Sequence, residues 1–359
     1  MDIKRIAEEA ISSVQAASPA VRAFQASHAA RYAIGRNTDT LNVHRAWPLA
    51  GVIDDFLSEP TWQGIPIVRT RDIRPDAWIV NCSTSISPVA VQRHLSGAGL
   101  QNVLGLHELS ACPSGNVPWP SFVQDQRDEI ALHGQAWSEI YATLEDARSR
   151  QVLLDVLRYR VTADPAYMQG YDVAIQEQYF EEFMDYREET FIDAGGFDGD
   201  TAQAFADRYP DYRKIIVFEP SEKNMQSATR RLASYRDIEF RTTGLSDTPG
   251  ALPFDPDTGS ASSVTASGSS MIIVETLDAA VTEPVSVIKM DLEGWELKAL
   301  HGSRSHITRE KPKLAIAVYH AAPDLRLIHR YVQGFGLGYK CYLRHYTQGW
   351  SETVMYFVR

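Results

Sequence analysis

The chain has 359 residues, of which 44% are hydrophobic and 23% are charged. This length exceeds the size at which a single core usually keeps growing, so we expect two domains, and the composition excludes wholesale disorder. The formal net charge is −11, and Lys and Arg form no basic cluster in the sequence. Because that charge opposes binding to phosphates, we expect no nucleic-acid partner.

The cysteines and the first residues bear on the cellular compartment. Cys82, Cys112 and Cys341 are far apart and lack the spacing of metal ligands, which fits a reducing compartment. Residues 1–20 contain no apolar run long enough for a signal peptide or a membrane span. We therefore expect a cytoplasmic protein without a transmembrane segment.

Residues 1–120 are predicted to form a small α/β domain. The Ala-rich segment from Ile3 to about Tyr32 is predicted to be helical. Short β-like runs then alternate with helical patterns, which is typical of a parallel sheet. The expected strands are Leu49–Ile53, Ile65–Val68, Ala77–Val80 and Val103–Leu106, and the expected helix is Val89–Leu100.

This domain has the pattern of half a nucleotide-binding fold in a degenerate form. The turn around Gly35 has a single glycine and so lacks a loop that would cradle a phosphate. Asp54 and Asp55 occupy the place of the acids that follow a second strand. Two interpretations stay open, a nucleotide site or a docking unit that binds no nucleotide, and the missing loop favours the second.

Residues 121–185 are predicted to be a helical linker. Helical patterns cover about Phe122–Arg160 and Pro165–Met184. In the first of them, large apolar residues such as Trp137 and Ile140 recur at helical spacing. We interpret these stripes as core-facing and not as a cofactor site.

Residues 191–200 are predicted to form a strand, a glycine turn and the start of a helix. Such a turn at the carboxyl edge of a parallel sheet is a ligand site, where glycines let the backbone approach the ligand. The spacing of Gly195, Gly196 and Gly199 is not that of a dinucleotide-binding loop. The acids of this turn are Asp193, Asp198 and Asp200. Carboxylates repel a pyrophosphate, so the turn favours a positively charged cofactor such as S-adenosylmethionine.

Two further strands are expected to add to this site. Lys214–Phe218 ends at Glu219, an acid placed where it can accept hydrogen bonds from two ribose hydroxyls. Ile238–Thr242 is a third strand, followed by Ser246 and Asp247 near the expected place of an adenine ring. The polar stretch from Asp255 to Ser270 is either a lid or a surface loop.

The next strands bring more acids and a histidine to the same edge. Val285–Met290 runs into Asp291 and Glu293, and the expected strand Leu314–Tyr319 ends at His320. If the sheet is doubly wound, these side chains lie beside the glycine turn. Lys289 is expected to pair with one of the carboxylates. The runs Tyr339–Leu343 and Thr353–Val358 are expected to form a final hairpin.

Five motifs of the C-terminal half occur in a fixed order. They are Asp193–Thr201, Phe218–Pro220, Leu245–Asp247, Ile288–Glu296 and Tyr319–His320. Together they resemble the FkbM-type methyltransferases, from about Gln178 to Arg359. The block Ile-Lys-Met-Asp-Leu-Glu-Gly-Trp-Glu over 288–296 is the most specific, whereas positions 195–196 carry Gly-Gly where many of those enzymes have Gly-Ala. The N-terminal half resembles, more weakly, a nucleotide-binding-like domain that precedes some of them.

The resemblance implies a class I methyltransferase domain over residues 186–359. Its fold is an α/β, Rossmann-like, doubly wound sheet, mostly parallel with an antiparallel final strand. It implies S-adenosylmethionine as methyl donor and O-methylation of a hydroxyl on a sugar, a glycolipid or another secondary metabolite. It places the methionine end of the cofactor at Asp193, Gly195 and Gly199.

A hydroxyl acceptor requires removal of its proton, and three residues are candidates for this step. His320 is the first, because the ordinary pKa of histidine lies near the working pH. Asp291 and Glu293 are alternatives, either as the base or as groups that orient the acceptor. The three side chains are also of the types that bind a divalent cation, and the sequence does not decide whether one is present.

Two other functions compete with the methyltransferase. One is an NAD-type oxidoreductase on a similar architecture, against which the acidic turn weighs. The other is an interaction module that keeps the cofactor fold without turnover. The sequence leaves a homo-oligomer open and does not identify the small-molecule, glycan or glycolipid acceptor.

Overall fold

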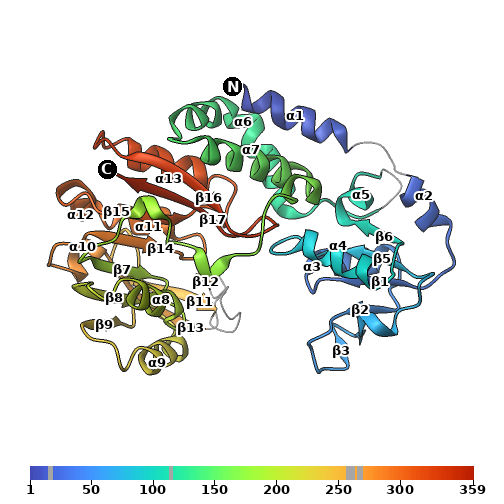
Figure 1. Cartoon of the computed structure of the whole chain (residues 1–359), viewed down its shortest axis with the longest axis horizontal. Coiled ribbons are helices and arrows are strands. Elements are labelled where there is room, and N and C mark those ends of the chain that lie inside the picture. The colour runs from blue at the N-terminus through green and yellow to red at the C-terminus, as the bar shows by residue number, and fades with distance from the viewer. Residues whose placement is uncertain (15–18, 113–115, 256–262, 265–269) are drawn as a thin grey trace. The chain divides into compact units, whose positions relative to one another are not determined.

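A computed structural model describes residues 1–14, 19–112, 116–255, 263–264 and 270–359 (Figure 1). The chain forms two compact units. The first comprises Met1–Ala142, Arg150–Ala174 and His345–Ser351, and the second comprises Thr143–Ser149, Ile175–Arg344 and Glu352–Arg359. The domain limits expected at residues 120 and 185 stay a prediction.

The first unit contains a six-stranded sheet in the order β3-β4-β2-β1-β5-β6. Its pairs are parallel, except that β3 is antiparallel to β4. The strands are β1 (Arg31–Ile34), β2 (Gly51–Ile53), β3 (Thr61–Trp62), β4 (Ile65–Val68), β5 (Trp78–Asn81) and β6 (Val103–Gly105). The expected α/β unit is confirmed, but β1 was not predicted as a strand. The helix expected to reach Tyr32 ends earlier, since Arg31–Ile34 pairs between β2 and β5.

Helices cover this sheet and extend beyond it. They are α1 (Ile3–Ser13), α2 (Pro19–Ala26), α3 (Thr38–Ala46), α4 (Pro88–Gly97), α5 (Leu106–Ser110), α6 (Ser121–Thr143) and α7 (Ala147–Thr162), with short 3₁₀ turns at η1 (Thr70–Asp72) and η2 (Pro165–Met168). The single helical stretch expected over Phe122–Arg160 is two helices, because Asp146 accepts the Ser149 amide at 2.7 Å and so begins α7. Trp137 and Ile140 are buried, as expected.

The second unit contains a seven-stranded sheet in the order β16-β17-β15-β14-β7-β8-β9. The strands are β7 (Thr190–Ala194), β8 (Lys214–Phe218), β9 (Ile238–Arg241), β14 (Val287–Met290), β15 (Lys313–Ala317), β16 (Lys340–His345) and β17 (Thr353–Val358). Strands β9, β8, β7, β14 and β15 are parallel, and β17 is antiparallel to β15. Strands β7, β14 and β17 are buried along their whole length, as expected for a sheet covered on both faces.

The helices that the structure describes alongside this sheet (Figure 1) are α8 (Asp200–Arg208), α9 (Glu222–Arg231), α10 (Leu277–Ala280), α11 (Glu296–His301), α12 (Arg304–Arg309) and α13 (Asp324–Gln333). The prediction of a helix over Pro165–Met184 is wrong. That segment has only 3₁₀ turns, η2 with η3 (Ile175–Glu177) and η4 (Glu182–Met184). Tyr179 adopts φ 74°, outside the helical region, while its amide donates to the Tyr356 hydroxyl at 3.0 Å.

A second, four-stranded sheet lies between β9 and β14 in the sequence. It consists of β10 (Gly244–Leu245), β11 (Gly250–Asp255), β12 (Ser263–Val264) and β13 (Ser270–Glu275), in the order β10-β13-β11-β12. The sequence did not predict it. Most of the loop expected over Asp255–Ser270 lies outside the described residues.

None of the helices in the described part of the chain combines the length and the apolar character that a membrane span requires.

Candidate active site

The glycine turn that follows β7 packs closely against two neighbouring elements. Gly195 has φ +78°, and a Cβ on it would overlap the carbonyl oxygen of Asp291, which follows β14. Gly199 has φ +85°, and its Cβ would lie 3.0 Å from the Cα of Ala228 in α9. The Gly195 amide donates to the Phe218 carbonyl at the end of β8, at 2.9 Å. Packing within the protein therefore requires both glycines, and the turn is fixed between β8 and β14.

Asp193, in β7, forms a buried ion pair with Lys289 of β14. The two residues are direct partners in the register of the parallel strands, and the Lys289 Nζ lies 2.9 Å from the Asp193 Oδ1. The side chains are 0% and 3% exposed. Burial raises the pKa of the Asp193 carboxyl against the opposing effect of Lys289. Burial lowers the pKa of Lys289, but Asp193 and Asp291 raise it by more, so the ammonium stays charged. The predicted pairing of Lys289 is confirmed.

The other oxygen of Asp193 has a different environment. Its Oδ2 atom is buried and has no hydrogen-bond partner among the described residues. The Lys289 Nζ also donates to the Gly195 carbonyl at 2.8 Å, so the ion pair holds the glycine turn in place. A role of Asp193, Gly195 and Gly199 at the methionine end of a cofactor stays a prediction.

The remaining acids of the turn are less free than the sequence suggested. Asp198 forms an ion pair with Arg231 of α9, and the Arg231 Nε donates to the Asp198 carbonyl at 2.9 Å. Asp200 is exposed at the start of α8. Cationic partners thus neutralise Asp193 and Asp198, and the repulsion of a phosphate that the sequence argument assumed is weaker than expected.

Glu219 directly follows β8 and is 6% exposed. Its Oε2 accepts the Phe197 amide at 3.0 Å, and its Oε1 accepts the Ser221 amide at 2.8 Å. Burial raises the pKa of the Glu219 carboxyl, and these amides oppose the rise. Each carboxylate oxygen can accept more than one hydrogen bond, so capacity for a ribose hydroxyl remains. That role stays a prediction.

Ser246 and Asp247 follow the short strand β10. The Ser246 side chain accepts the Trp295 Nε1–H at 3.2 Å and donates to Asp247 Oδ1 at 3.1 Å. Because Trp295 belongs to the turn after β14, this contact places Ser246 beside the segment that carries Asp291 and Glu293. Ser246 is 3% exposed, whereas Asp247 is exposed. Their role near an adenine ring stays a prediction.

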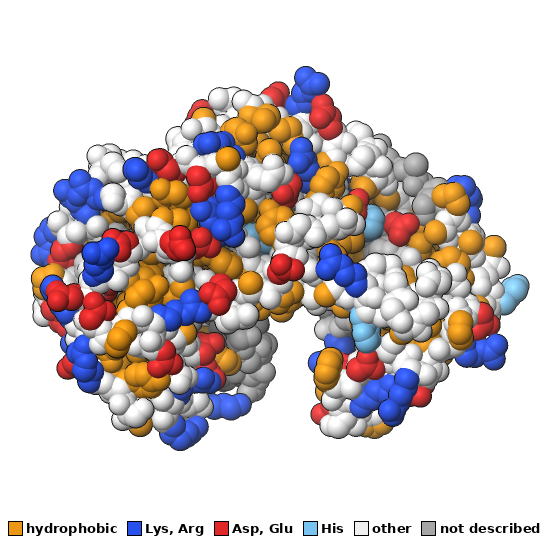
Figure 2. Space-filling model, in the orientation of Figure 1, with side chains coloured by type: hydrophobic (Ala, Val, Ile, Leu, Met, Phe, Trp, Pro, Cys, Tyr) orange, Lys and Arg blue, Asp and Glu red, His pale blue; other side chains and the backbone are white. Residues whose placement is uncertain are grey.

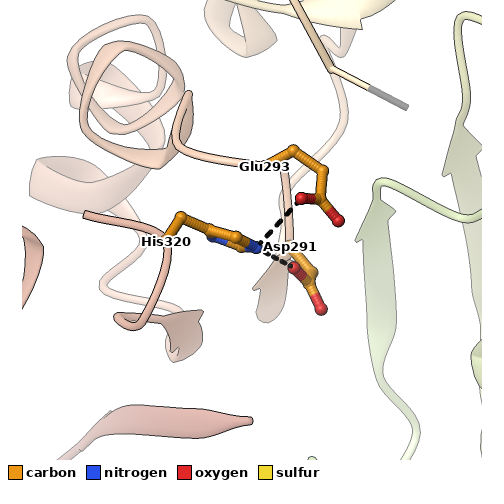
Figure 3. A group of neighbouring side chains, drawn as sticks. All are labelled: Asp291, Glu293 and His320. Carbon is orange, nitrogen blue, oxygen red and sulfur yellow. Dashed lines mark ion pairs between the residues drawn. The ribbon is translucent and has the colours of Figure 1, made fainter. Parts of the chain in front are cut away.

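Asp291, Glu293 and His320 converge on one point (Figure 3). The His320 Nε2 lies 3.4 Å from the Asp291 Oδ1 and 3.5 Å from the Glu293 Oε2. The acids come from the loop after β14, and His320 comes from the loop after β15, the neighbouring strand. The structure therefore brings together all three residues that the sequence assigned to catalysis, beside the glycine turn that Asp291 touches.

The charges of this group argue against His320 as the base. Burial lowers the pKa of His320, but the carboxylates of Glu296, Asp291 and Glu293 raise it by more, to about 10. The ring therefore carries a proton at neutral pH when no other ligand is bound. Burial raises the pKa of Glu293 to about 7. The ordinary pKa near neutrality, on which the choice of His320 depended, does not hold here.

Two side chains that sequence reasoning missed hold this group in place. Glu296 is 1% exposed, and its Oε1 lies 3.0 Å from the His320 Nδ1. Tyr179 donates its hydroxyl to the Asp291 Oδ2 at 2.9 Å. Glu296 belongs to the 288–296 motif, where it could have been recognised. Tyr179 had no local signal, because it comes from the segment that was predicted to be a helix.

In the first unit, the residues that were candidates for a nucleotide site make contacts with other parts of the same unit. Asp54 accepts the Phe56 and Leu57 amides, each at 2.9 Å, and Asp55 accepts the Thr70 amide at 2.8 Å. A Cβ on Gly35 would lie 2.8 Å from the backbone of Cys82, so packing explains this glycine. A cavity of about 620 Å³ is lined by Gly35, Asp54 and Asp55 among others. The choice between a nucleotide site and a docking unit stays open.

Comparison with known proteins identifies the second unit. Residues 193–341 match the family described as "Methyltransferase FkbM domain", a span that contains the glycine turn, Glu219 and the group around His320. Residues 193–341 form an FkbM methyltransferase domain. The chain therefore contains a methyltransferase domain of the FkbM family, which uses S-adenosylmethionine, and the family expected from the motifs of this half is confirmed. This result favours the methyltransferase over the competing oxidoreductase.

A solved structure supports the fold over the whole chain. The FkbM methyltransferase from Methylobacillus flagellatus KT matches with a TM-score of 0.75 at 22% sequence identity, covering 99% of both chains. The class I methyltransferase fold, with a mostly parallel sheet, an antiparallel final strand and an additional N-terminal α/β unit, is confirmed.

Other solved structures match only about half of the chain. An rRNA methylase from Streptococcus thermophilus has a TM-score of 0.32 at 18% identity, over 48% of this chain and 86% of its own. Fibrillarin from Aeropyrum pernix, solved with S-adenosyl-L-methionine, has a TM-score of 0.36 at 14% identity, over 52% and 73%. These scores are too low to establish a common fold. No curated protein matches the chain.

Proposed function

We propose that this FkbM methyltransferase transfers the methyl group to a hydroxyl of a sugar, a glycolipid or another secondary metabolite. The observation that carries the proposal is the convergence of Asp291, Glu293 and His320 beside the glycine turn. As the hydroxyl oxygen forms its bond to the methyl carbon and the carbon–sulfur bond breaks, the hydroxyl proton must leave. All three side chains are titratable, and we assign the proton to one of the two carboxylates, because His320 already carries a proton at neutral pH. The acceptor class follows from the resemblance to FkbM-type enzymes.

The cofactor is assigned to the residues predicted for it. S-adenosylmethionine supplies a methyl group that is already activated on a sulfonium. The unpartnered Oδ2 of Asp193, with Gly195 and Gly199, suits the methionine end, which carries an ammonium group. Glu219 is assigned to the ribose hydroxyls, and Ser246 and Asp247 to the adenine side. Holding donor and acceptor in line is worth up to about 7–11 kcal/mol in favourable cases.

The proposed reaction can be tested on the acceptor side. Mass spectrometry of glycans and glycolipids from cells with and without the gene should show one species that loses 14 Da per methyl group, a mass difference of about one CH₂, when the gene is removed. Purified protein should then restore the methyl group on that species and release S-adenosylhomocysteine. With Asp291→Asn or Glu293→Gln the rate should fall by about 10²–10⁴-fold. Methylation found only on nitrogen or sulfur would contradict the proposal, and no methylation of any kind would favour the non-catalytic module.

The cofactor assignment has a separate test. Glu219→Gln should weaken S-adenosylmethionine binding by about 10-fold or more in calorimetry, because hydrogen bonds to a charged group contribute about 1.5–3 kcal/mol. The matched control is Glu222→Gln, an exposed acid at the start of α9, which should bind as the wild type does. Equal affinity in both variants would remove Glu219 from the cofactor site.

The expected absence of a nucleic-acid partner belongs to this proposal. On the face shown in Figure 2, Lys and Arg side chains are interspersed with Asp and Glu side chains over the second unit. Binding to a phosphate backbone usually depends on a continuous basic surface. The mixed charge on this face supports a small-molecule or glycan acceptor.

A further inference from the structure

We infer that Asp291, Glu293 and His320 hold one divalent cation of the Mg²⁺ or Mn²⁺ class, which binds the acceptor hydroxyl. The ion's role rests on the proposed function, because it would orient the hydroxyl toward the methyl donor and lower the pKa of that hydroxyl, whose proton would pass to the uncoordinated oxygen of Glu293 or to water. Binding of the ion does not depend on that function and can be measured alone.

The ligand atoms have the spacing of a coordination site. One atom each from Asp291, Glu293 and His320 lies within 4.8 Å of the others. The His320 Nε2 is 3.4 Å from the Asp291 Oδ1 and 3.5 Å from the Glu293 Oε2. Metal–ligand bonds of about 2.0–2.2 Å at angles between octahedral and tetrahedral place neighbouring ligand atoms about 3.0–3.5 Å apart. An ion between the three atoms therefore needs little movement of the side chains.

His320 provides an independent indication of a ligand. Its side chain is only 9% exposed, and its Nε2 makes no hydrogen bond of good geometry with the described residues, whereas its Nδ1 faces the Glu296 carboxylate at 3.0 Å. Figure 3 shows the ring edge directed between the two carboxylates. Buried polar atoms are nearly always satisfied, so an unsatisfied ring nitrogen aimed at two carboxylates calls for a bound partner.

The surroundings also resemble the outer shell of a metal site. Histidines that bind metals usually direct their second nitrogen at a carboxylate or carbonyl, which fixes the ring. Here Glu296 lies 3.0 Å from the Nδ1 of His320 and is itself held by the Leu292 amide at 2.6 Å. Tyr179 binds the Asp291 Oδ2 at 2.9 Å, which leaves the Oδ1 directed toward His320. Two of the three proposed ligands, His320 and Asp291, are therefore held in orientation by neighbouring side chains.

The exposure of the side chains indicates which set of residues holds the ion, and the types of ligand indicate which ion it is. Asp291 and Glu293 are 21% and 27% exposed, so an ion there keeps open positions for water or a hydroxyl. Glu296, His320 and Asp324 form a second possible set, but Glu296 is 1% exposed and already accepts a backbone amide. Two carboxylates with one imidazole and open positions suit Mg²⁺ or Mn²⁺ better than a closed zinc site.

The experiment is a titration of the full chain with Mn²⁺, followed by electron paramagnetic resonance, without S-adenosylmethionine. We expect one saturable site per chain. Asp291→Asn and Glu293→Gln should each weaken Mn²⁺ binding by at least 10-fold, since even outer-shell changes cost about 10–100-fold. Asp324→Asn, which removes a carboxylate from the second set, is the matched control and should bind Mn²⁺ as the wild type does.

Three results would overturn the inference: no saturable binding by the wild type, unchanged binding by both site variants, or loss of binding in Asp324→Asn alone. Circular dichroism checks that each variant is folded, and two independent site variants guard against one that is not. Calorimetry with S-adenosylmethionine in the presence of EDTA separates the two proposals. Loss of cofactor binding there would count against the methyltransferase assignment, whereas absence of Mn²⁺ binding would count only against the ion.

Discussion

The Lys289–Asp193 pair shows how one contact serves both stability and the site. Both charges are buried at register-matched positions of β7 and β14, and Lys289 also binds the Gly195 carbonyl. Removing charges from water is costly, so such a pair contributes little net stability as a unit. Removing one member is different, because the other charge is left buried without compensation. The pair therefore makes the position of the glycine turn depend on a single ammonium group.

We predict that Lys289→Met lowers the free energy of unfolding by about 3–5 kcal/mol, the usual cost of breaking a buried ion pair. Urea denaturation followed by circular dichroism measures this change. Lys298→Met is the control: that lysine is exposed, with its Nζ 3.8 Å from the Trp295 ring centroid, and its loss should cost less than about 1 kcal/mol. Similar costs for the two variants would mean that the pair is not buried in solution.

Single residues show where sequence reasoning succeeds and where it fails. Asp291 and His320 could be placed together, because the ends of neighbouring parallel strands meet at one sheet edge. Their protonation could not be predicted, since it depends on Glu296 and on burial. Asp198 looked available for a ligand, but its partner Arg231 is 33 residues away in sequence. Charge pairing between distant segments leaves no local pattern.

At the scale of elements, the glycine turn is the point where β7, β8 and β14 meet. Gly195 donates to the last residue of β8 and lies against the carbonyl of Asp291 after β14. A side chain on Gly195 would have to displace the backbone that carries Asp291 and Glu293. The glycine turn and the loop after β14 are thus packed directly against each other, so a substitution in the turn should displace the loop.

We predict that Gly195→Ala impairs both S-adenosylmethionine binding and stability, because its Cβ overlaps backbone and its φ of +78° strains an L-residue. Calorimetry and thermal unfolding measure the two effects. Gly250→Ala is the control in the same unit, where a Cβ meets nothing within 4 Å, and it should change neither quantity. Wild-type affinity in Gly195→Ala would show that the turn can shift without affecting the site.

The elements that could be predicted are those whose own residues show a local pattern of hydrophobic or β-branched side chains. Strand β8 was placed at its observed limits, since Lys214–Phe218 is a β-branched run bounded by polar residues. The segment 165–184 was wrongly predicted as a helix, because contacts such as Tyr179 with Tyr356 override its helical spacing. The small sheet of β10 to β13 was missed, since two of its strands have only two residues.

At the scale of the whole molecule, each compact unit is assembled from separate stretches of the chain. Residues His345–Ser351, almost at the C-terminal end, belong to the first unit together with Met1–Ala142. The sequence predicted two α/β sheets but gave no sign of this return, because it depends on contacts that are distant along the chain. The Gln348 side chain, for example, accepts the Ala90 amide at 2.8 Å. Stability of the first unit should therefore respond to groups in this late segment.

His345 provides a test of that dependence through pH. It is 5% exposed, and burial, with Arg160 nearby, lowers its pKa to about 3. The unfolded value is about 6.5, so the unfolded state binds more protons between these limits and stability falls as pH falls through 6.5. This group alone should reduce the free energy of unfolding by about 2 kcal/mol between pH 7 and pH 5.

The variant His345→Gln isolates this contribution, because an amide can keep the 3.3 Å contact with the Thr347 hydroxyl but does not titrate. Tryptophan fluorescence during urea denaturation reports mainly on the first unit, since of the seven tryptophans only Trp295 lies in the second. Above pH 7 the histidine is neutral in both the folded and the unfolded state, so the difference in free energy of unfolding between wild type and variant should be constant. On acidification to pH 5 this difference should change by about 2 kcal/mol, because only the wild type loses stability through this group. If the two curves fall together, His345 is not buried as a neutral group, and the late segment does not support the first unit.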